Sequence, residues 1–262
     1  PEAFGPVKVL GRGRCVVMSH GSFLNMKDNL RFYKKSWLAD AFQGYLKWVI
    51  KKADRLLVLD EGTKADYERL NRDVHLVLNS IEYRERVYRD FDPKSMKLLF
   101  VGRLSAVKNI GPIIDAAEAM TEVKSLSIVG DGEERERLEM QAGPKTSFQG
   151  SLGAEGVREQ MRHADVLVMN SKHEGVPMTI LEAMGMGMPI VSTEVGGIAA
   201  VVPFGALAEK TDGTAESIEE AVRVVANCYD ERSAAVFEES KNYYYTEANS
   251  RIYGLLREVE SR

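Results

Sequence analysis

The sequence is poor in cysteine and has no large excess of either charge, and each shortage excludes a class of protein. Cys15 and Cys228 are its two cysteines among 262 residues, far apart and outside any CxxC pattern. We therefore expect no disulfide framework and no cysteine-based metal site, but reduced cysteines of the core type. The formal net charge is −4, so no global basic field indicates nucleic acid as a partner.

Long apolar runs are also absent. No stretch of about 18 consecutive apolar residues occurs, which is the length that a membrane-spanning helix needs. The chain begins with Pro1 rather than Met, and its opening segment does not resemble a signal peptide. We therefore expect a cytoplasmic protein, and either a fragment or a product of processing.

Short β-branched apolar runs alternate with helical patterns along most of the chain. Runs that are apolar on both faces and separated by helices are typical of a parallel sheet covered on both sides. The predicted fold class is therefore α/β, with doubly wound parallel sheets. The predicted strands are 15–19, 55–59, 75–78, 97–101, 125–129, 146–149, 165–169 and 189–192. The predicted helices include 109–120, 133–141, 154–163 and 215–229.

The polar and charged segment after Asn79, interrupted by Pro93, predicts a linker between two units. We expect residues 1–94 to form a partial N-terminal Rossmann-like unit together with this linker. Its three predicted strands are too few for a full sheet of this kind, so the unit is expected to be incomplete. Residues 95–240 are predicted to form a complete nucleotide-binding Rossmann-like domain, and residues 241–262 a closing helix.

The stretch from Glu174 to Glu182 carries the clearest chemical signal. It follows a predicted strand after a short polar loop, and Pro177 suits the first position of a helix. The first backbone N–H groups of that helix would form an anion site, flanked by a carboxylate on each side. Those donors belong to Val176, Met178 and Thr179. Because carboxylates accept hydrogen bonds from sugar hydroxyls, the pattern indicates a site for a sugar carried on a diphosphate.

Together with other motifs, this stretch resembles the signature of the retaining GT-B glycosyltransferases of family four. The likeness covers residues 75–205 densely, with departures at Ser80 and Ala200, where the family usually has glycine and glutamate. The matching motifs are Asn79-Ser80-Ile81, Gly102-Arg103-Leu104 with Lys108-Asn109, Gly130-Asp131-Gly132, Phe148-x-Gly150 with Ser151-Leu152, Glu174-x7-Glu182, and Gly196-Gly197-Ile198.

The resemblance implies a GT-B fold of two Rossmann-type units, the first on the acceptor side and the second holding the donor. It implies transfer of a sugar from a UDP-, GDP- or ADP-sugar to a hydroxyl acceptor, which is a glycan, a lipid or a small molecule. It further implies retention of anomeric configuration, with no metal and no cofactor. The implied catalytic residues are Arg103, Lys108, Glu174 and His20. The implied donor-binding residues are Gly102, Ser151, Leu152, Gly175, Val176, Pro177, Met178, Thr179 and Glu182.

Within this scheme Arg103 and Lys108 hold the diphosphate and stabilise the leaving group. Glu174 positions the transferred sugar, and Glu182 holds the ribose. His20 follows the predicted strand 15–19, at the carboxyl edge where open sheets bind ligands.

Two other functions stay open. A donor-binding domain whose N-terminal half is missing or separate would bind a nucleotide sugar without turnover. A sugar-nucleotide epimerase on the same fold would form its product with no acceptor present. The motif Asp90-Phe91-Asp92 is formally a metal-diphosphate DxD, but its position in the linker favours coincidence, so no metal is predicted.

The segment 20–55 differs from the rest of the chain in charge. It carries eight Lys or Arg against three Asp, with seven Phe, Tyr and Trp residues among them. Basic residues interleaved with aromatics can dock on an anionic bilayer surface, which would place the protein at the inner face of a membrane. The alternative is that the aromatics pack a core and the lysines are solvated around it.

Overall fold

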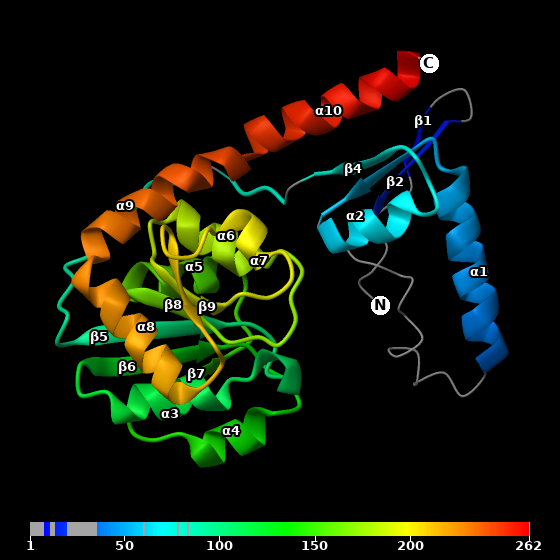
Figure 1. Ribbon diagram of the computed structural model, residues 1–262. Coiled ribbons are helices and arrows are strands. Elements are labelled where there is room, and N and C mark those ends of the chain that lie inside the picture. The colour runs from blue at the N-terminus through cyan, green and yellow to red at the C-terminus, as the bar shows by residue number, and fades with distance from the viewer. Residues whose placement is uncertain are drawn as a thin grey trace. The chain divides into compact units, whose positions relative to one another are not determined.

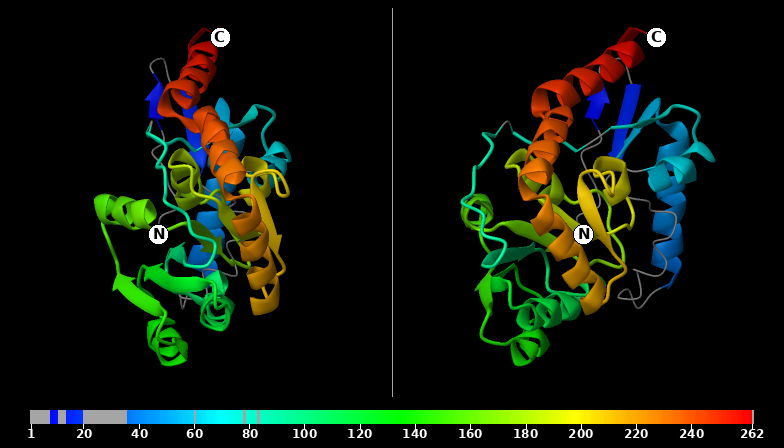
Figure 2. Two further views of the ribbon diagram at one scale, coloured as in Figure 1. Left: turned by 90° about the vertical axis from the view of Figure 1, so that its left-hand side faces the viewer. Right: turned by 60° about the vertical axis from the view of Figure 1, so that its left-hand side comes forward.

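The chain divides into two compact units, which Figures 1 and 2 show as ribbons. One unit comprises Pro1–Ser80 and Tyr245–Arg262, and the other comprises Ile81–Tyr244. This computed structural model describes residues 8–10, 14–19, 36–59, 61–77, 79–82 and 84–261. The division falls earlier than the predicted boundary at 94, and the closing helix belongs to the first unit.

The described residues of the first unit form a four-stranded sheet in the order β1-β2-β3-β4. The strands are β1 (Lys8–Leu10), β2 (Arg14–Ser19), β3 (Arg55–Val58) and β4 (Val74–Leu76). The helices are α1 (Ser36–Lys52), α2 (Glu61–Glu68) and α10 (Tyr245–Ser261). β2, β3 and β4 pair in parallel, whereas β1 is antiparallel to β2. The sequence did not predict β1, because three residues are too few to show a period.

Both faces of this sheet are covered, because alternate residues of a strand point to opposite sides. Leu56 and Val58 of β3 pack with Leu46 and Ile50 of α1 in one buried cluster. Leu57, between them, belongs to a second cluster that includes Val259 of α10. The C-terminal helix therefore completes the core of the N-terminal unit.

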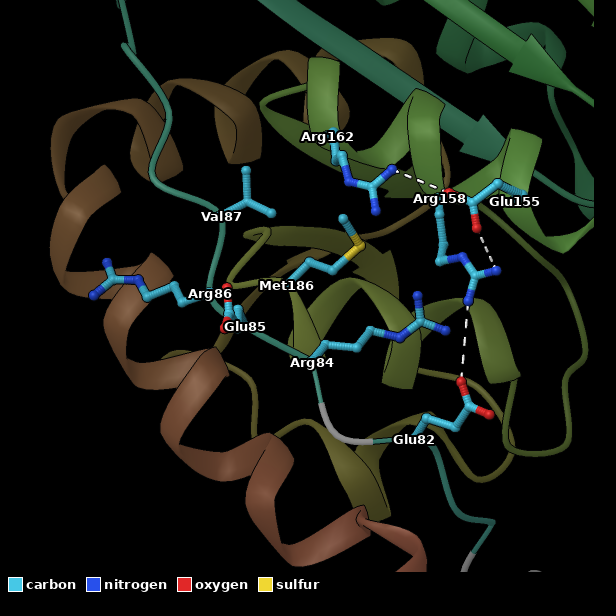
Figure 3. Close-up of a pocket in the computed structure, with 9 residues that line it drawn as sticks. All are labelled: Glu82, Arg84, Glu85, Arg86, Val87, Glu155, Arg158, Arg162 and Met186. Carbon is cyan, nitrogen blue, oxygen red and sulfur yellow. Dashed lines mark hydrogen bonds and ion pairs between the residues drawn. The ribbon is translucent and has the colours of Figure 1, made fainter.

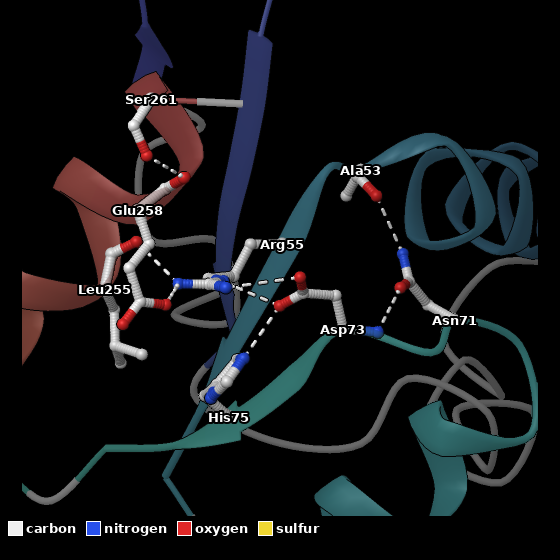
Figure 4. A network of polar contacts seen from close by, with 8 residues as sticks. All are labelled: Ala53, Arg55, Asn71, Asp73, His75, Leu255, Glu258 and Ser261. Carbon is white, nitrogen blue, oxygen red and sulfur yellow. Dashed lines mark hydrogen bonds and ion pairs between the residues drawn. The ribbon is translucent and has the colours of Figure 1, made fainter.

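A buried arginine fastens α10 to the sheet (Figure 4). The side chain of Arg55 is 1% exposed, and its Nε donates to Asp73 Oδ1 at 2.6 Å. Its Nη1 donates to the Leu255 carbonyl at 2.6 Å and to Glu258 Oε2 at 2.9 Å. The hydrogen bond with Asp73 raises the pKa of the guanidinium. Its Nη2 donates to Asp73 Oδ2 at 3.2 Å, so each nitrogen of the buried guanidinium has a partner, as a buried charge requires.

The second unit contains a parallel six-stranded sheet in the order β10-β9-β8-β5-β6-β7. The strands are β5 (Met96–Val101), β6 (Val123–Val129), β7 (Thr146–Gly150), β8 (Val166–Met169), β9 (Ile190–Thr193) and β10 (Ala208–Thr211). The helices are η3 (Ala106–Lys108), α3 (Gly111–Ala119), α4 (Arg135–Gln141), α5 (Ala154–His163), α6 (Met178–Gly185), α7 (Ile198–Val201), α8 (Ala215–Asn227), α9 (Tyr229–Ser240) and η4 (Lys241–Tyr243). Counted within the unit, this order is that of the Rossmann fold.

The sheet of the second unit is also covered on both sides, which confirms the predicted α/β class. In Figure 1, α3 and α4 lie below the strands, and α5 and α6 lie above them. The strand β8 is buried along its whole length, as are the four residues of β9. The sequence did not predict β10, whose partly exposed Glu209 and exposed Lys210 interrupt the apolar run at the sheet edge.

The segment 81–94 belongs to the second unit because its polar groups bond there. Arg89 Nε donates to the Ala164 carbonyl at 2.6 Å, and its Nη2 donates to the Met161 carbonyl at 2.8 Å. Its Nη1 donates to the Met186 carbonyl at 3.2 Å. These carbonyls stand at the ends of α5 and α6, where a helix leaves acceptors without internal partners. The segment predicted as a linker is therefore held to the second unit.

Candidate functional site

The strand order of the second unit reverses between β5 and β8. In open α/β sheets, ligands bind outside the carboxyl ends of the strands at this point. The loops that follow these strands are joined here, since the Lys172 amide donates to the Val107 carbonyl at 2.8 Å. The end of β9 is joined too, because Thr193 Oγ1 donates to the Ser171 carbonyl at 2.7 Å. Hydrogen bonds thus connect the loops at this edge of the sheet to one another.

An ion pair between Lys108 and Glu174 stands at this edge. Lys108 Nζ makes a short hydrogen bond to Glu174 Oε1, and Ser171 Oγ donates to the same oxygen at 2.6 Å. The two charged side chains are only 20% and 10% exposed. A carboxylate with a cation and a hydroxyl on one oxygen is held in one orientation. The structure therefore brings together two of the predicted catalytic residues and adds Ser171, which the sequence did not indicate.

Two asparagines hold the loop that carries Lys108. Asn109 has a left-handed backbone with φ of 48°. Asn170 Nδ2 donates to the carbonyls of Asn109 and Gly213, both at 3.0 Å. This bridge ties the end of β8 to the loops after β5 and β10, and so it fixes the position of Lys108.

The double glycine at 196 and 197 lets another loop lie on the backbone of Glu174. Gly196 has φ of +58°, and a Cβ there would lie 1.6 Å from the Glu174 carbonyl oxygen. The Gly197 amide donates to the Gly175 carbonyl at 3.1 Å. Any side chain at 196 would displace this loop, so the glycine is a condition for the position of Glu174.

The helix α6 begins directly after this loop. Pro177 is its N-cap, with φ of −71° and ψ of 124°, so the helix begins at Met178, one residue later than predicted. Met178 and Thr179 thus lie in the first turn, where backbone N–H groups have no intrahelical acceptor. The positive end of the helix and these donors make this turn suited to an anion.

Glu182 lies one turn further along α6 and is 26% exposed. Its Oε1 lies 3.9 Å from Arg84 Nη2, which is an ion pair without a hydrogen bond. Burial raises the pKa of this carboxyl, and the charges of Arg84 and Arg158 oppose that rise. These arginines were not predicted, because their segments look like ordinary solvated charge runs.

The remaining predicted residues are more scattered. Gly102 follows β5, and its amide donates to the Val129 carbonyl at 3.0 Å. Arg103 is 74% exposed and pairs with Glu133 at 3.1 Å. Ser151 and Leu152 follow β7 and are exposed. His20 lies outside the described residues, so its predicted role stays a prediction.

Residues of the Asp90-Phe91-Asp92 motif make contacts within the second unit. Asp92 Oδ1 accepts from the Lys94 amide at 2.9 Å, and the Phe91 ring stacks on Tyr229 with centroids 3.7 Å apart. Within the described ranges, no group of three or more metal-ligating side chains is present. Nor is any described helix long and apolar enough to span a bilayer.

The Rossmann strand order, with a charged pair at its reversal point, defines the second unit as a nucleotide-binding type of α/β domain. The family model "Glycosyl transferases group 1" matches residues 95–227, just over half of the chain. The chain belongs to this family, which confirms the resemblance found in its motifs.

Curated relatives match over part of their length. Sulfoquinovosyl transferase SQD2 of Arabidopsis thaliana is 26% identical over 187 residues, covering 65% of this chain and 36% of the relative. A GDP-mannose-dependent alpha-mannosyltransferase of Mycolicibacterium smegmatis is 32% identical over 114 residues, covering 43% of this chain and 30% of the relative. The matched parts thus span about a third of these relatives.

Solved structures extend the likeness to almost the whole chain. HepE of Anabaena, in complex with UDP and glucose, superposes with a TM-score of 0.75 at 16% identity, covering 94% of this chain and 72% of HepE. Sucrose-phosphate synthase of Thermosynechococcus elongatus gives 0.75 at 18% identity, covering 94% and 68%. At such identities the likeness shows the fold, which is GT-B.

Proposed function

We propose that this chain contains the donor site of a retaining glycosyltransferase that uses a UDP-, GDP- or ADP-sugar. The observation that carries the proposal is the Lys108–Glu174–Ser171 cluster beside the first turn of α6, at the strand reversal. Family membership supports it. The names of relatives support it too, since one is GDP-mannose-dependent and a structural neighbour was solved with UDP and glucose.

The reaction exchanges one bond at the anomeric carbon for another. The bond from that carbon to the diphosphate oxygen breaks, and a bond to the acceptor oxygen forms on the same face of the sugar. The acceptor proton passes to the leaving phosphate oxygen, so no protein nucleophile is required. Negative charge grows on the diphosphate, where Lys108 and the amides of Met178 and Thr179 stabilise it.

Glu174 positions the transferred sugar in this scheme. Lys108 and Ser171 occupy Oε1, and the carboxylate can accept sugar hydroxyls at its other lone pairs. Glu182 holds the ribose hydroxyls one turn away. Backbone groups of Gly102, Ser151 and Leu152 complete the donor site, with Gly175, Val176 and Pro177 shaping the turn between the carboxylates.

Arg103 joins the site by leaving its present partner. Its pair with Glu133 is largely exposed to solvent, and such pairs contribute only about 0 to 1 kcal/mol. A bound diphosphate offers stronger, doubly charged acceptors. The guanidinium therefore turns from Glu133 to the donor at little cost.

A second partner is proposed from α1, which would contact an anionic membrane surface. Tyr45 and Trp48 are exposed and stacked on each other with centroids 6.2 Å apart. Exposed Lys47, Lys51 and Lys52 lie on the same helix. These two aromatics do not pack a core, and an exposed aromatic pair among lysines suits the boundary of an anionic bilayer.

Turnover with the full chain tests the proposed transfer. Release of UDP, GDP or ADP from the matching sugar nucleotides is measured with and without hydroxyl acceptors. We expect acceptor-dependent release that falls about a hundredfold or more in Lys108→Ala, because the leaving-group charge loses its cation. Binding without release would indicate the non-catalytic domain, and a new sugar nucleotide formed without acceptor would indicate the epimerase.

A further inference from the structure

A pocket of about 400 Å³ lies between α5, the C-terminal end of α6 and the segment 82–87 (Figure 3). Its lining contains four arginines and three glutamates, together with Val87 and Met186. Met186 follows the C-terminal end of α6, about 12 Å along the helix from Met178. The pocket is therefore separate from the proposed diphosphate position at the helix start.

Two arginines of this pocket have donors without protein partners. Arg84 is 14% exposed, and within the part of the chain that the structure describes it forms an ion pair with Glu182 at 3.9 Å. Among the described residues, the Nε atoms of Arg84 and Arg158 are buried with no hydrogen-bond partner. Arg158 Nη2 does bond Glu155 at 2.5 Å, but Nη1 stands 4.0 Å from Glu82. The Arg84 guanidinium points across the pocket toward Arg158 (Figure 3).

Other arginines in the chain show what a structural role looks like. Arg89 spends all three of its nitrogens on backbone carbonyls of the same unit. Arg55 is fully paired by two carboxylates and a carbonyl. Buried polar groups in proteins almost always have partners, and an exception points to a function or a bound group. Arg84 and Arg158 are such exceptions, and both border one cavity.

The surroundings leave these guanidinium groups open to an anion. Glu82 and Glu155 are exposed at the rim, where water screens their charge. Helix C-terminal ends normally disfavour anions, but Arg89 takes up the carbonyls of Met161 and Met186 at the ends of α5 and α6. Glu85 also lines the pocket and is exposed. Glu182 is a partly buried carboxylate near Arg84, and no hydrogen bond joins the two.

We propose that this pocket binds a phosphate group through Arg84 and Arg158. A guanidinium binds phosphate through parallel N–H donors, and two of them from different elements can surround a tetrahedral oxyanion. The cavity is large enough for more than a bare ion, so a phosphomonoester of sugar size fits the same chemistry. The site uses neither Lys108 nor the start of α6, but Arg84 also pairs with Glu182, so the pocket adjoins the proposed ribose position while remaining distinct from the proposed diphosphate position.

Calorimetric titration of the full chain with inorganic phosphate, and separately with glucose 6-phosphate, tests the site. We expect saturable binding that weakens at least tenfold in Arg84→Met and in Arg158→Met. The matched control Arg137→Met, on α4 and paired with Glu134, leaves it unchanged. Tighter binding of glucose 6-phosphate identifies a phosphomonoester as the ligand, and equal binding identifies the free ion.

Lys108→Ala separates this pocket from the proposed donor site. We expect Lys108→Ala to bind phosphate as the wild type does. If Lys108→Ala lost phosphate binding while Arg84→Met kept it, the proposal would be overturned. Thermal unfolding of each variant checks that the variant is folded. Without phosphate, Arg84→Met melts at or above the wild-type temperature, because an unpartnered buried donor is removed. Phosphate then raises the melting temperature of the wild type but not that of Arg84→Met; a rise of equal size in Arg84→Met would also contradict the site.

Discussion

Glu174 keeps one orientation because two donors occupy one of its oxygens. Ser171 supplies the second of these donors at 2.6 Å. Ser171→Ala should remove one hydrogen bond while leaving the ion pair with Lys108 in place. We expect the free energy of unfolding to fall by about 1 kcal/mol and kcat/KM to fall about tenfold. Steady-state kinetics beside chemical denaturation measures both, and unchanged kcat/KM would show that the hydroxyl does not hold Glu174.

Glu182 predicts a pH dependence of donor affinity. Burial raises the pKa of this carboxyl above its ordinary value near 4.5, so it takes up a proton at a higher pH than a solvated glutamate. Its capacity to accept both ribose hydroxyls should then be lost in mildly acidic solution. Nucleotide-sugar titrations across pH should show affinity falling on acidification. Glu182→Gln should bind weakly at every pH, and a wild-type profile that is flat down to pH 4.5 would contradict the ribose role.

The contribution of Glu182 to folding stability should change with pH in the opposite direction to its contribution to donor affinity. Because the pKa of Glu182 is raised in the folded chain, the folded state binds this proton more tightly than the unfolded state. Its contribution to stability is therefore full below the ordinary glutamate value and is lost as the pH rises through the folded pKa. The unfolding free energies of wild type and Glu182→Gln, measured against pH, test this direction: the contribution of Glu182 should fall as the pH rises.

Replacing Arg89, in the segment 81–94, is expected to cause a large loss of folding stability. Burial lowers the pKa of its guanidinium, and the donors end on carbonyls of α5 and α6. Arg89→Met would leave these buried acceptors without partners, at a cost of about 3 kcal/mol. Urea denaturation measures it. A change below about 0.5 kcal/mol would mean that the segment 81–94 is held by other contacts.

At the scale of elements, loops that meet at the sheet edge depend on glycine. Gly196→Ala would drive a Cβ into the Glu174 carbonyl, 1.6 Å away, at a positive φ. We expect about 2 kcal/mol of destabilisation and at least a tenfold loss of donor affinity, since the loop bearing Glu174 must move. Gly44→Ala is the control. Gly44 lies in α1 with open space around it, and alanine should stabilise that helix by about 1 kcal/mol.

The helix α1 makes a separate prediction about membranes. Trp48→Ser removes one of the two exposed rings of the aromatic pair, and it should reduce cosedimentation with phosphatidylglycerol vesicles severalfold. Phosphatidylcholine vesicles should bind weakly in every case because the lysines find no anionic lipid. Tyr253→Ser, another exposed aromatic on α10, is the matched control. Equal loss in both variants would argue against a specific face on α1.

At the scale of the whole molecule, the sequence was informative where burial is continuous. Strands such as β8, buried on both faces, produce apolar runs that a reader of the sequence recognises. The edge strand β10 carries Glu209 and Lys210 and shows no such run. The compact units divide before the expected boundary at 94, and nothing local in the sequence indicates that Arg89 bonds the ends of distant helices.

The residues of the candidate site could likewise be predicted from the sequence only in part. Glu174, Lys108 and Glu182 stand in short motifs with fixed spacing, so the sequence indicates them directly. Ser171 acts through a hydrogen bond to Glu174 in its own loop, and Asn170 through hydrogen bonds to two other loops. A serine or asparagine after a strand has many other uses. The meeting of Arg84 and Arg158 with Glu182 joins three distant segments, which only the fold brings together.

Binding of the donor tests the central claim most directly. The full chain is titrated calorimetrically with UDP-glucose, GDP-mannose and ADP-glucose, alongside Lys108→Ala and the exposed control Lys124→Ala. We predict saturable binding of at least one of these nucleotide sugars, weakened at least tenfold by Lys108→Ala and unchanged by Lys124→Ala. Saturable binding of none of them, or equal affinity in wild type and Lys108→Ala, would contradict the assignment of the Lys108–Glu174 cluster as the donor site.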